Sequence, residues 1–135
     1  MGFGRRTMTA LDVAEARRLQ AALRDLFTRH NGSAPDFRAL RRVLYLCQAA
    51  SNALDDAYCR EKLRLVGEYA AELFSHRDHA KWGRDSASGV EFLRQQVLNA
   101  LELCASRLYS LEALRASRAA GEKLPWAMRS GIAQT

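Results

Sequence analysis

The chain has 135 residues and a mass of 15.1 kDa, and 48% of its residues are hydrophobic, which is enough for one domain with its own core. No run approaches the roughly eighteen apolar residues of a membrane span, and no apolar stretch typical of a signal peptide follows Arg5 and Arg6. We therefore expect a cytoplasmic protein without membrane contact, and the net charge of +6 admits an acidic partner, nucleic acid included.

The first predicted helix follows a flexible basic arm at residues 1–8. Thr9 and Asp12 have the spacing of a capping box, which satisfies backbone N–H groups at the start of a helix. Leucine then recurs every three or four positions, as it does on one face of a helix. The helix is expected to end at Gly32, because glycine suits the left-handed conformation that closes helices.

A second capping box, Ser33 with Asp36, opens the longest periodic stretch of the chain, which reaches His76 without an internal proline. Its stripe returns every three or four positions and is polar only at Ser51 and at the step of Glu61 or Lys62: Phe37, Leu40, Leu44, Cys47, Ser51, Leu54, Tyr58, Leu65, Tyr69 and Leu73. This spacing predicts a single helix over Asp36–His76, with a length of about 60 Å.

The alternative is a turn near Asn52. Asp55 and Asp56 follow it, and acidic residues are favoured at the N-terminal end of a helix, so this segment has the chemistry to cap a new one. The alanines around it and the absence of glycine or proline favour a continuous helix instead. Gly67 is the expected bend or close-contact point.

Periodicity is lost between Ser75 and Ser88, which predicts a turn. Ser88 and Glu91 form a third capping box and open a helix that should end before Gly121. The apolar stripe of this helix consists of Leu93, Val97, Leu101, Cys104, Leu108 and Leu111.

The predicted fold class is all-α. We expect an antiparallel bundle of three long helices, or of four if the chain turns near Asn52. The helical domain is predicted at residues 9–120, between the basic arm and a C-terminal tail at residues 121–135.

The histidines do not form a recognisable metal site. His76 and His79 lie three residues apart with Asp78 between them, but no third ligand accompanies them at a spacing typical of zinc. We interpret the group as polar residues at the C-terminal end of a helix, where imidazolium is favoured by the helix dipole. No metal and no cofactor are expected.

The cysteines are predicted to be reduced thiols. Cys47 and Cys104 lie on apolar stripes and are expected in the core, whereas Cys59 lies beside a stripe and is expected to be the least buried. The chain has no Gly-x-Ser-x-Gly elbow and no glycine-rich phosphate loop. We therefore expect a protein without catalytic activity.

Two groups of residues are candidates for binding. Arg38, Arg41, Arg42 and Tyr45 share one helical face, which is the chemistry that grips phosphates and stacks a base. The aromatic residues Tyr58, Tyr69, Trp82 and Trp126 are candidate interface anchors.

These patterns favour a small helical protein–protein interaction or regulatory module. We expect a homodimer, because flanking helices of about 30 and 45 Å cannot cover the apolar stripe of a helix of about 60 Å. The alternative is a nucleic-acid-associated protein that uses its arginine-rich helical face.

Overall fold

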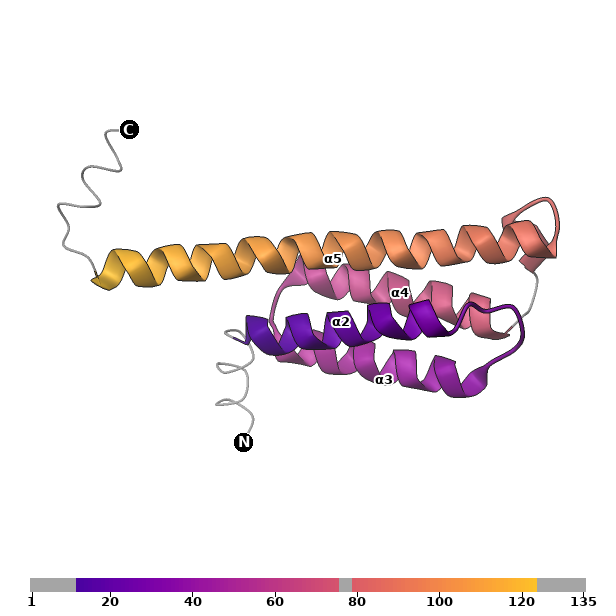
Figure 1. Ribbon diagram of the computed structural model, residues 1–135, viewed down its shortest axis with the longest axis horizontal. Helices are drawn as coiled ribbons and strands as arrows, with labels where there is room; N and C mark the ends of the chain where they lie inside the picture. Colours follow the sequence, from indigo (N-terminus) through magenta and orange to yellow (C-terminus); the bar gives the residue numbers. More distant parts are fainter. Residues whose placement is uncertain (1–11, 76–78, 124–135) are drawn as a thin grey trace.

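The computed structural model describes residues 12–75 and 79–123, and these ranges contain four α-helices and no strand. The helices are α2 (Val13–Arg29), α3 (Phe37–Ala53), α4 (Ala57–Ser75) and α5 (Ser86–Lys123), with a short 3-10 helix η1 (His79–Trp82) before α5. Each helix packs against the next one, and α5 also packs against α2, so α2, α3, α4 and α5 surround the core in that order. Consecutive helices run in opposite directions (Figure 1). The all-α bundle is confirmed, in its four-helix form.

The chain reverses at Leu54–Asp56, so the prediction of one helix over Asp36–His76 is wrong. Leu54 has an extended backbone (φ −146°, ψ 126°), and its side chain turns into the core with only 4% exposed. Asp56 then accepts a hydrogen bond from the backbone N–H of Cys59 at 3.0 Å and caps α4. The reversal lets α3 and α4 bury apolar side chains against each other, which a single straight helix cannot do.

An aspartate caps each of the four helices. Its carboxylate accepts the backbone N–H three residues ahead, at 2.8–3.0 Å, in the pairs Asp12–Glu15, Asp36–Ala39, Asp56–Cys59 and Asp85–Ser88. The predicted caps Ser33 and Ser88 are therefore wrong, and Thr9 lies outside the described residues. A carboxylate in this position satisfies a free N–H group and also interacts favourably with the positive end of the helix dipole.

The core follows the predicted stripes of α2 and α5, but on α3 and α4 it contains only part of them, including Cys47 and Leu73. In α5, Leu93, Val97, Leu101, Cys104 and Leu108 are all at most 1% exposed. In α3, the buried residues are Ala39, Val43, Leu46, Cys47, Ala50 and Ala53. Phe37 and Leu44, which belong to the predicted stripe, are 56% and 47% exposed. Both α3 and α4 thus carry a second apolar face outside the core.

The longest helix is α5, with 38 residues and a length of about 57 Å. It is twice as long as α4, which has 19 residues. Residues 113–120 are all exposed, and the end of α5 projects beyond the other three helices in Figure 1. The predicted end before Gly121 is too early, because the helix continues to Lys123.

Candidate interaction surfaces

The outer face of α3 carries the least balanced charge of the four helices. Arg38, Arg41 and Arg42 form no ion pair with any described residue, and α3 contains no acidic residue. In contrast, every arginine of α2 and of α4 pairs with a carboxylate; these are Arg17, Arg18, Arg24, Arg29, Arg60 and Arg64. Three guanidinium groups on one helix face therefore remain available to an acidic partner.

Large apolar side chains lie among these arginines. Tyr45 is 62% exposed, and the guanidinium of Arg42 lies over its ring, 5.5 Å from the centroid. Phe37 and Leu44 are exposed on the same helix. Arginine and tyrosine are the residue types that most often dominate binding energy at protein interfaces. The four predicted residues thus lie together, and Phe37 and Leu44, which were assigned to the core, belong to the same surface. We call these six residues the α3 surface: Phe37, Arg38, Arg41, Arg42, Leu44 and Tyr45.

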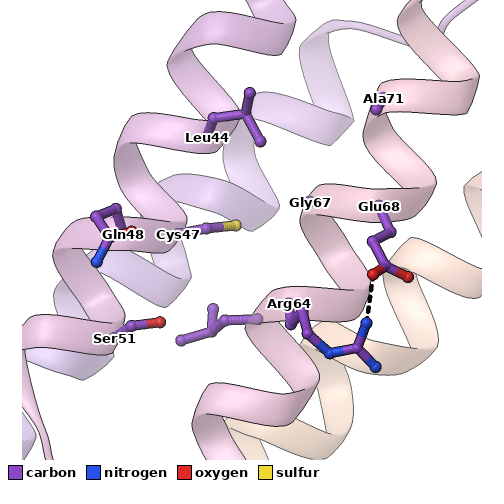
Figure 2. Close-up of a pocket in the computed structure, with 9 residues that line it drawn as sticks. Leu44, Cys47, Gln48, Ser51, Arg64, Gly67, Glu68 and Ala71 are labelled. Atoms are coloured by element: carbon purple, nitrogen blue, oxygen red, sulfur yellow. Dashed lines mark hydrogen bonds and ion pairs between the residues drawn. The ribbon is translucent and has the colours of Figure 1, made fainter.

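A groove of about 490 Å³ runs between α3 and α4, next to Leu44. Figure 2 shows Leu44, Cys47, Gln48 and Ser51 on the α3 side, opposite Arg64, Gly67, Glu68 and Ala71 of α4. Most of these side chains are small or apolar. The missing side chain of Gly67 keeps the groove open, since a Cβ added there would lie 3.4 Å from Leu44 Cδ2.

A second surface lies where the first turn of α4 meets α5. A pocket of about 510 Å³ is lined by Tyr58, Leu103, Ser106, Arg107 and Ser110. Tyr58 and Leu103 are 43% and 45% exposed. The Nζ of Lys62 lies 5.0 Å from the centroid of the Tyr58 ring. The pocket therefore offers an aromatic ring and a leucine side chain to a partner.

The predicted anchors Tyr69 and Trp82 belong to an aromatic cluster at the other end of the same face. The ring of Trp82 stacks on Phe92, with centroids 5.8 Å apart, and meets the ring of Tyr69 edge-on at 6.0 Å. Trp82 and Tyr69 are half-buried, whereas Phe92 is 39% exposed. The cluster joins α4, η1 and α5, so its main contribution is to packing. Trp126 lies outside the described residues.

A row of exposed apolar residues runs along α5, and the one charged residue beside Leu103 on it, Arg107, is paired with Asp56. Phe92, Leu103 and Leu114 are spaced eleven residues apart, which is close to three full turns, so they lie on one face. The exposed residues between and after them on this face are polar but uncharged: Asn99, Ser106, Ser110 and Ser117. We call this row the α5 line. Sequence reasoning missed it because it followed only the stripe through Leu93 and Leu101 along this helix.

All three cysteines are buried, and Cys59 is less exposed (3%) than Cys47 (8%), so the expectation that Cys59 is the least buried is wrong. The turn at Leu54–Asp56 places Cys59 on the inner face of α4, where its thiol is hydrogen-bonded to that of Cys104. This hydrogen bond is the main cause of a raised pKa of Cys59, and burial of the thiol is the second cause. Burial raises the pKa of Cys47 to about 12. Both thiols are therefore protonated at neutral pH and are poor nucleophiles.

His79 is 4% exposed and lies at the C-terminal end of α4. Its Nε2–H donates to the backbone carbonyl oxygens of Glu72 and Leu73, at 2.8 and 3.1 Å. These carbonyls belong to the last turn of the helix, where no N–H group of the helix reaches them. His76 and Asp78 lie outside the described residues, and across residues 12–75 and 79–123 no three His, Cys, Asp or Glu side chains are placed to hold a metal ion.

No protein-family model, curated protein or solved structure matches this chain. In the part of the chain that the structure describes, none of the helices is both long and apolar enough to cross a membrane.

Proposed function

We propose that this chain is a non-catalytic protein–protein interaction module that pairs with a second copy of itself along α5. The observation that carries the proposal is the α5 line, which continues past the end of the bundle as exposed Leu114. Burial of these apolar side chains against another chain is favourable. The homodimer was expected because a long helix at Asp36–His76 would have left apolar residues uncovered. That helix does not exist, and in this proposal α5 is the long helix with uncovered apolar residues.

The spacing of the α5 line makes it self-complementary. Leu103 is eleven residues from Phe92 and eleven from Leu114. When two α5 helices lie antiparallel with Leu103 on the two-fold axis, Phe92 of each copy faces Leu114 of the other. Such an isologous contact needs only one surface patch, which is why two-fold dimers are the commonest oligomers. Arg107 lies one turn from Leu103, but its guanidinium is paired with Asp56, so no unpaired charge lies beside the axis.

The projecting end of α5 also favours this arrangement. A helix end that is exposed on all sides gains little from its own bundle, and short isolated helices are marginal in water. In the antiparallel pair, this end of each copy extends along the first half of the partner helix. The pocket between Tyr58 and Leu103 lies at the edge of the contact and has room for a side chain of the second copy. A standard-size interface would require about 800 Å² from each subunit.

Light scattering after gel filtration tests the proposal. The wild-type chain is expected at twice the monomer mass of 15.1 kDa. Leu103→Glu should be monomeric, because it places two carboxylates at the axis, and its helix content should not change because Leu103 is 45% exposed. Tyr109→Glu is the matched control: Tyr109 is 68% exposed on α5 but lies about 100° away from the α5 line, so this variant should remain a dimer.

A wild-type chain that is monomeric across micromolar concentrations would overturn the proposal. A Leu103→Glu variant that remains dimeric would show that another surface forms the dimer.

A further inference from the structure

We infer that the α3 surface, together with the groove between α3 and α4, binds an acidic amphipathic helix of another protein. This site goes beyond self-association, because α3 packs against α2 and α4 and lies diagonally opposite α5 in the bundle. A variant that breaks the α5 contact therefore leaves the α3 surface intact, and the two proposals can fail independently.

Charge complementarity selects an acidic partner. The other arginines of the neighbouring helices α2 and α4 are neutralised by carboxylates, but Arg38, Arg41 and Arg42 are not paired with any described residue. A second copy of the chain does not fit this surface. Two α3 surfaces would bring six unpaired guanidinium groups together, and like charges across an interface are strongly unfavourable.

The apolar part of the site selects a protein rather than a nucleic acid. Leu44 is 47% exposed and forms one wall of the groove, whose lining includes Cys47, Ser51, Gly67 and Ala71. The groove also contains Gln48 and the Arg64–Glu68 ion pair, in which the arginine is already neutralised. A phosphate backbone gains nothing from an aliphatic wall and would meet the carboxylate of Glu68 in the groove. An amphipathic helix inserts apolar side chains into such a groove, and small residues let its backbone come close.

The position of the arginines relative to the groove predicts the pattern of the partner. Arg41 lies one helical turn from Leu44. Arg38 and Arg42 lie on the side that faces α2, where they line a pocket together with Asp25 and Asp36 but form no ion pair with them. A partner helix in the groove would therefore present apolar residues at positions i, i+4 and i+7 to α3 and α4. Its acidic residues would lie along the edge next to Arg41, and Arg38, one turn before Arg41 on α3, would add to the positive charge along that edge. The exposed rings of Phe37 and Tyr45 would flank that edge.

A displayed library of random peptides of about eighteen residues, or about five helical turns, tests the inference on the full-length protein. Peptides enriched on the wild-type chain are expected to be acidic, with apolar residues at helical spacing. Their affinity is then measured by fluorescence anisotropy. Arg38→Gln combined with Arg41→Gln should weaken binding by about tenfold or more, which is the effect of removing charged partners at an interface.

The matched control removes the same charge elsewhere. Arg84 and Arg118 are exposed and lie outside the α3 surface. Arg84→Gln combined with Arg118→Gln should leave the affinity within about twofold, well under the tenfold step of about 1.4 kcal/mol. Scrambling an enriched peptide keeps its charge but destroys its apolar face, and it should also weaken binding by about tenfold.

Three results would overturn the inference. The first is the absence of enriched acidic peptides. The second is equal binding of the enriched and scrambled sequences, which would indicate a non-specific charge effect. The third comes from labelled single-stranded and duplex DNA of mixed sequence: if DNA binds more tightly than the best peptide and the Arg38→Gln, Arg41→Gln variant loses this binding, the α3 surface is a nucleic-acid site instead.

Discussion

Asp56 has two roles at the turn between α3 and α4. One carboxylate oxygen accepts the backbone N–H of Cys59 at 3.0 Å, and the other accepts Arg107 Nη2 of α5 at 2.8 Å. The hydrogen bond from Arg107, together with that from the Cys59 amide, lowers the pKa of Asp56 despite its partial burial. This single side chain therefore caps the N-terminus of α4 and links α4 to α5 through an ion pair.

Substitution of Asp56 separates these roles. Asp56→Ala removes both and should lower the free energy of unfolding by about 1–2 kcal/mol at neutral pH, mainly through the lost cap. Asp56→Asn keeps a capping side chain and should cost less, because it loses only the charged pair with Arg107, whose side chain is 39% exposed. Urea unfolding of the three proteins measures these differences.

The pH dependence has a defined sign. Because the folded-state pKa of Asp56 lies below its unfolded value of about 3.9, its ionised form stabilises the fold above that pH. The stabilisation disappears as the pH falls through the folded-state pKa. The difference in the free energy of unfolding between wild type and Asp56→Asn should therefore be largest near neutral pH and should disappear in acid. A constant gap across this range would show that the Arg107 pair contributes no pH-dependent stability.

At the scale of whole helices, two glycines act in opposite ways. Gly67 lies in the middle of α4, where alanine is favoured over glycine by about 1 kcal/mol, and a Cβ there would meet Leu44 Cδ2 at an acceptable 3.4 Å. Gly67→Ala should thus stabilise the protein by about 0.5–1 kcal/mol. In α5, a Cβ on Gly89 would lie 1.8 Å from the carbonyl oxygen of His79. Gly89→Ala must displace η1 and should cost at least about 2 kcal/mol in urea unfolding. Similar effects of both variants on the free energy of unfolding would contradict the close contact between Gly89 and the backbone of His79.

A second prediction at this scale concerns the point along α5 at which the core of the bundle ends. Leu108 is 1% exposed, whereas Leu114 is 53% exposed. In a Leu103→Glu background, which removes self-association, Leu108→Ala should destabilise the chain by about 2–4 kcal/mol. Leu114→Ala should stay within about 0.5 kcal/mol of its parent. A large loss from Leu114→Ala would mean that the projecting turns of α5 pack against the bundle.

The helices with one apolar face could be predicted from the sequence, and those with two could not. The stripe of α5 through Leu93 and Leu101 has an apolar residue at every turn, whereas polar residues separate Phe92, Leu103 and Leu114, so the phase of the buried row was unambiguous. In α3, the rows through Phe37 and Leu44 and through Val43 and Ala50 are both helical, and only packing decides which one is buried. The continuous periodicity from α3 into α4 followed the outer row. It therefore concealed the turn, which contains neither glycine nor proline and is marked only by the cap Asp56.

The presence of two apolar rows on α3 also explains which residues of the α3 surface could be predicted from the sequence. The arginines of the α3 surface were found because exposed charge is visible in a sequence. Phe37 and Leu44 were missed because an apolar residue at helical spacing is normally part of the core. The exposed apolar row and the unpaired arginines belong together, and this became visible only once Val43 and Ala50 were seen to fill the core.

At the scale of the whole molecule, the two surfaces lie at opposite corners of the bundle. The α5 line faces away from α3, since α2 and α4 separate the two helices. A dimer formed through α5 would therefore carry two α3 surfaces that point away from each other. Each would be free to bind its own helix, and one assembly would link two partner molecules.

This geometry predicts avidity without cooperativity. In solution, a peptide selected on the α3 surface should bind the wild-type dimer and the Leu103→Glu monomer with the same affinity per chain, because the two sites do not touch. On a sensor coated densely with that peptide, the dimer engages two sites at once and should dissociate at least about tenfold more slowly than the monomer. Sparse coating serves as the control, because the sites are then too far apart to be bridged and the two proteins should dissociate at the same rate. Equal dissociation from the dense surface would show that one copy blocks the α3 surface of the other, and the antiparallel arrangement along α5 would have to be abandoned.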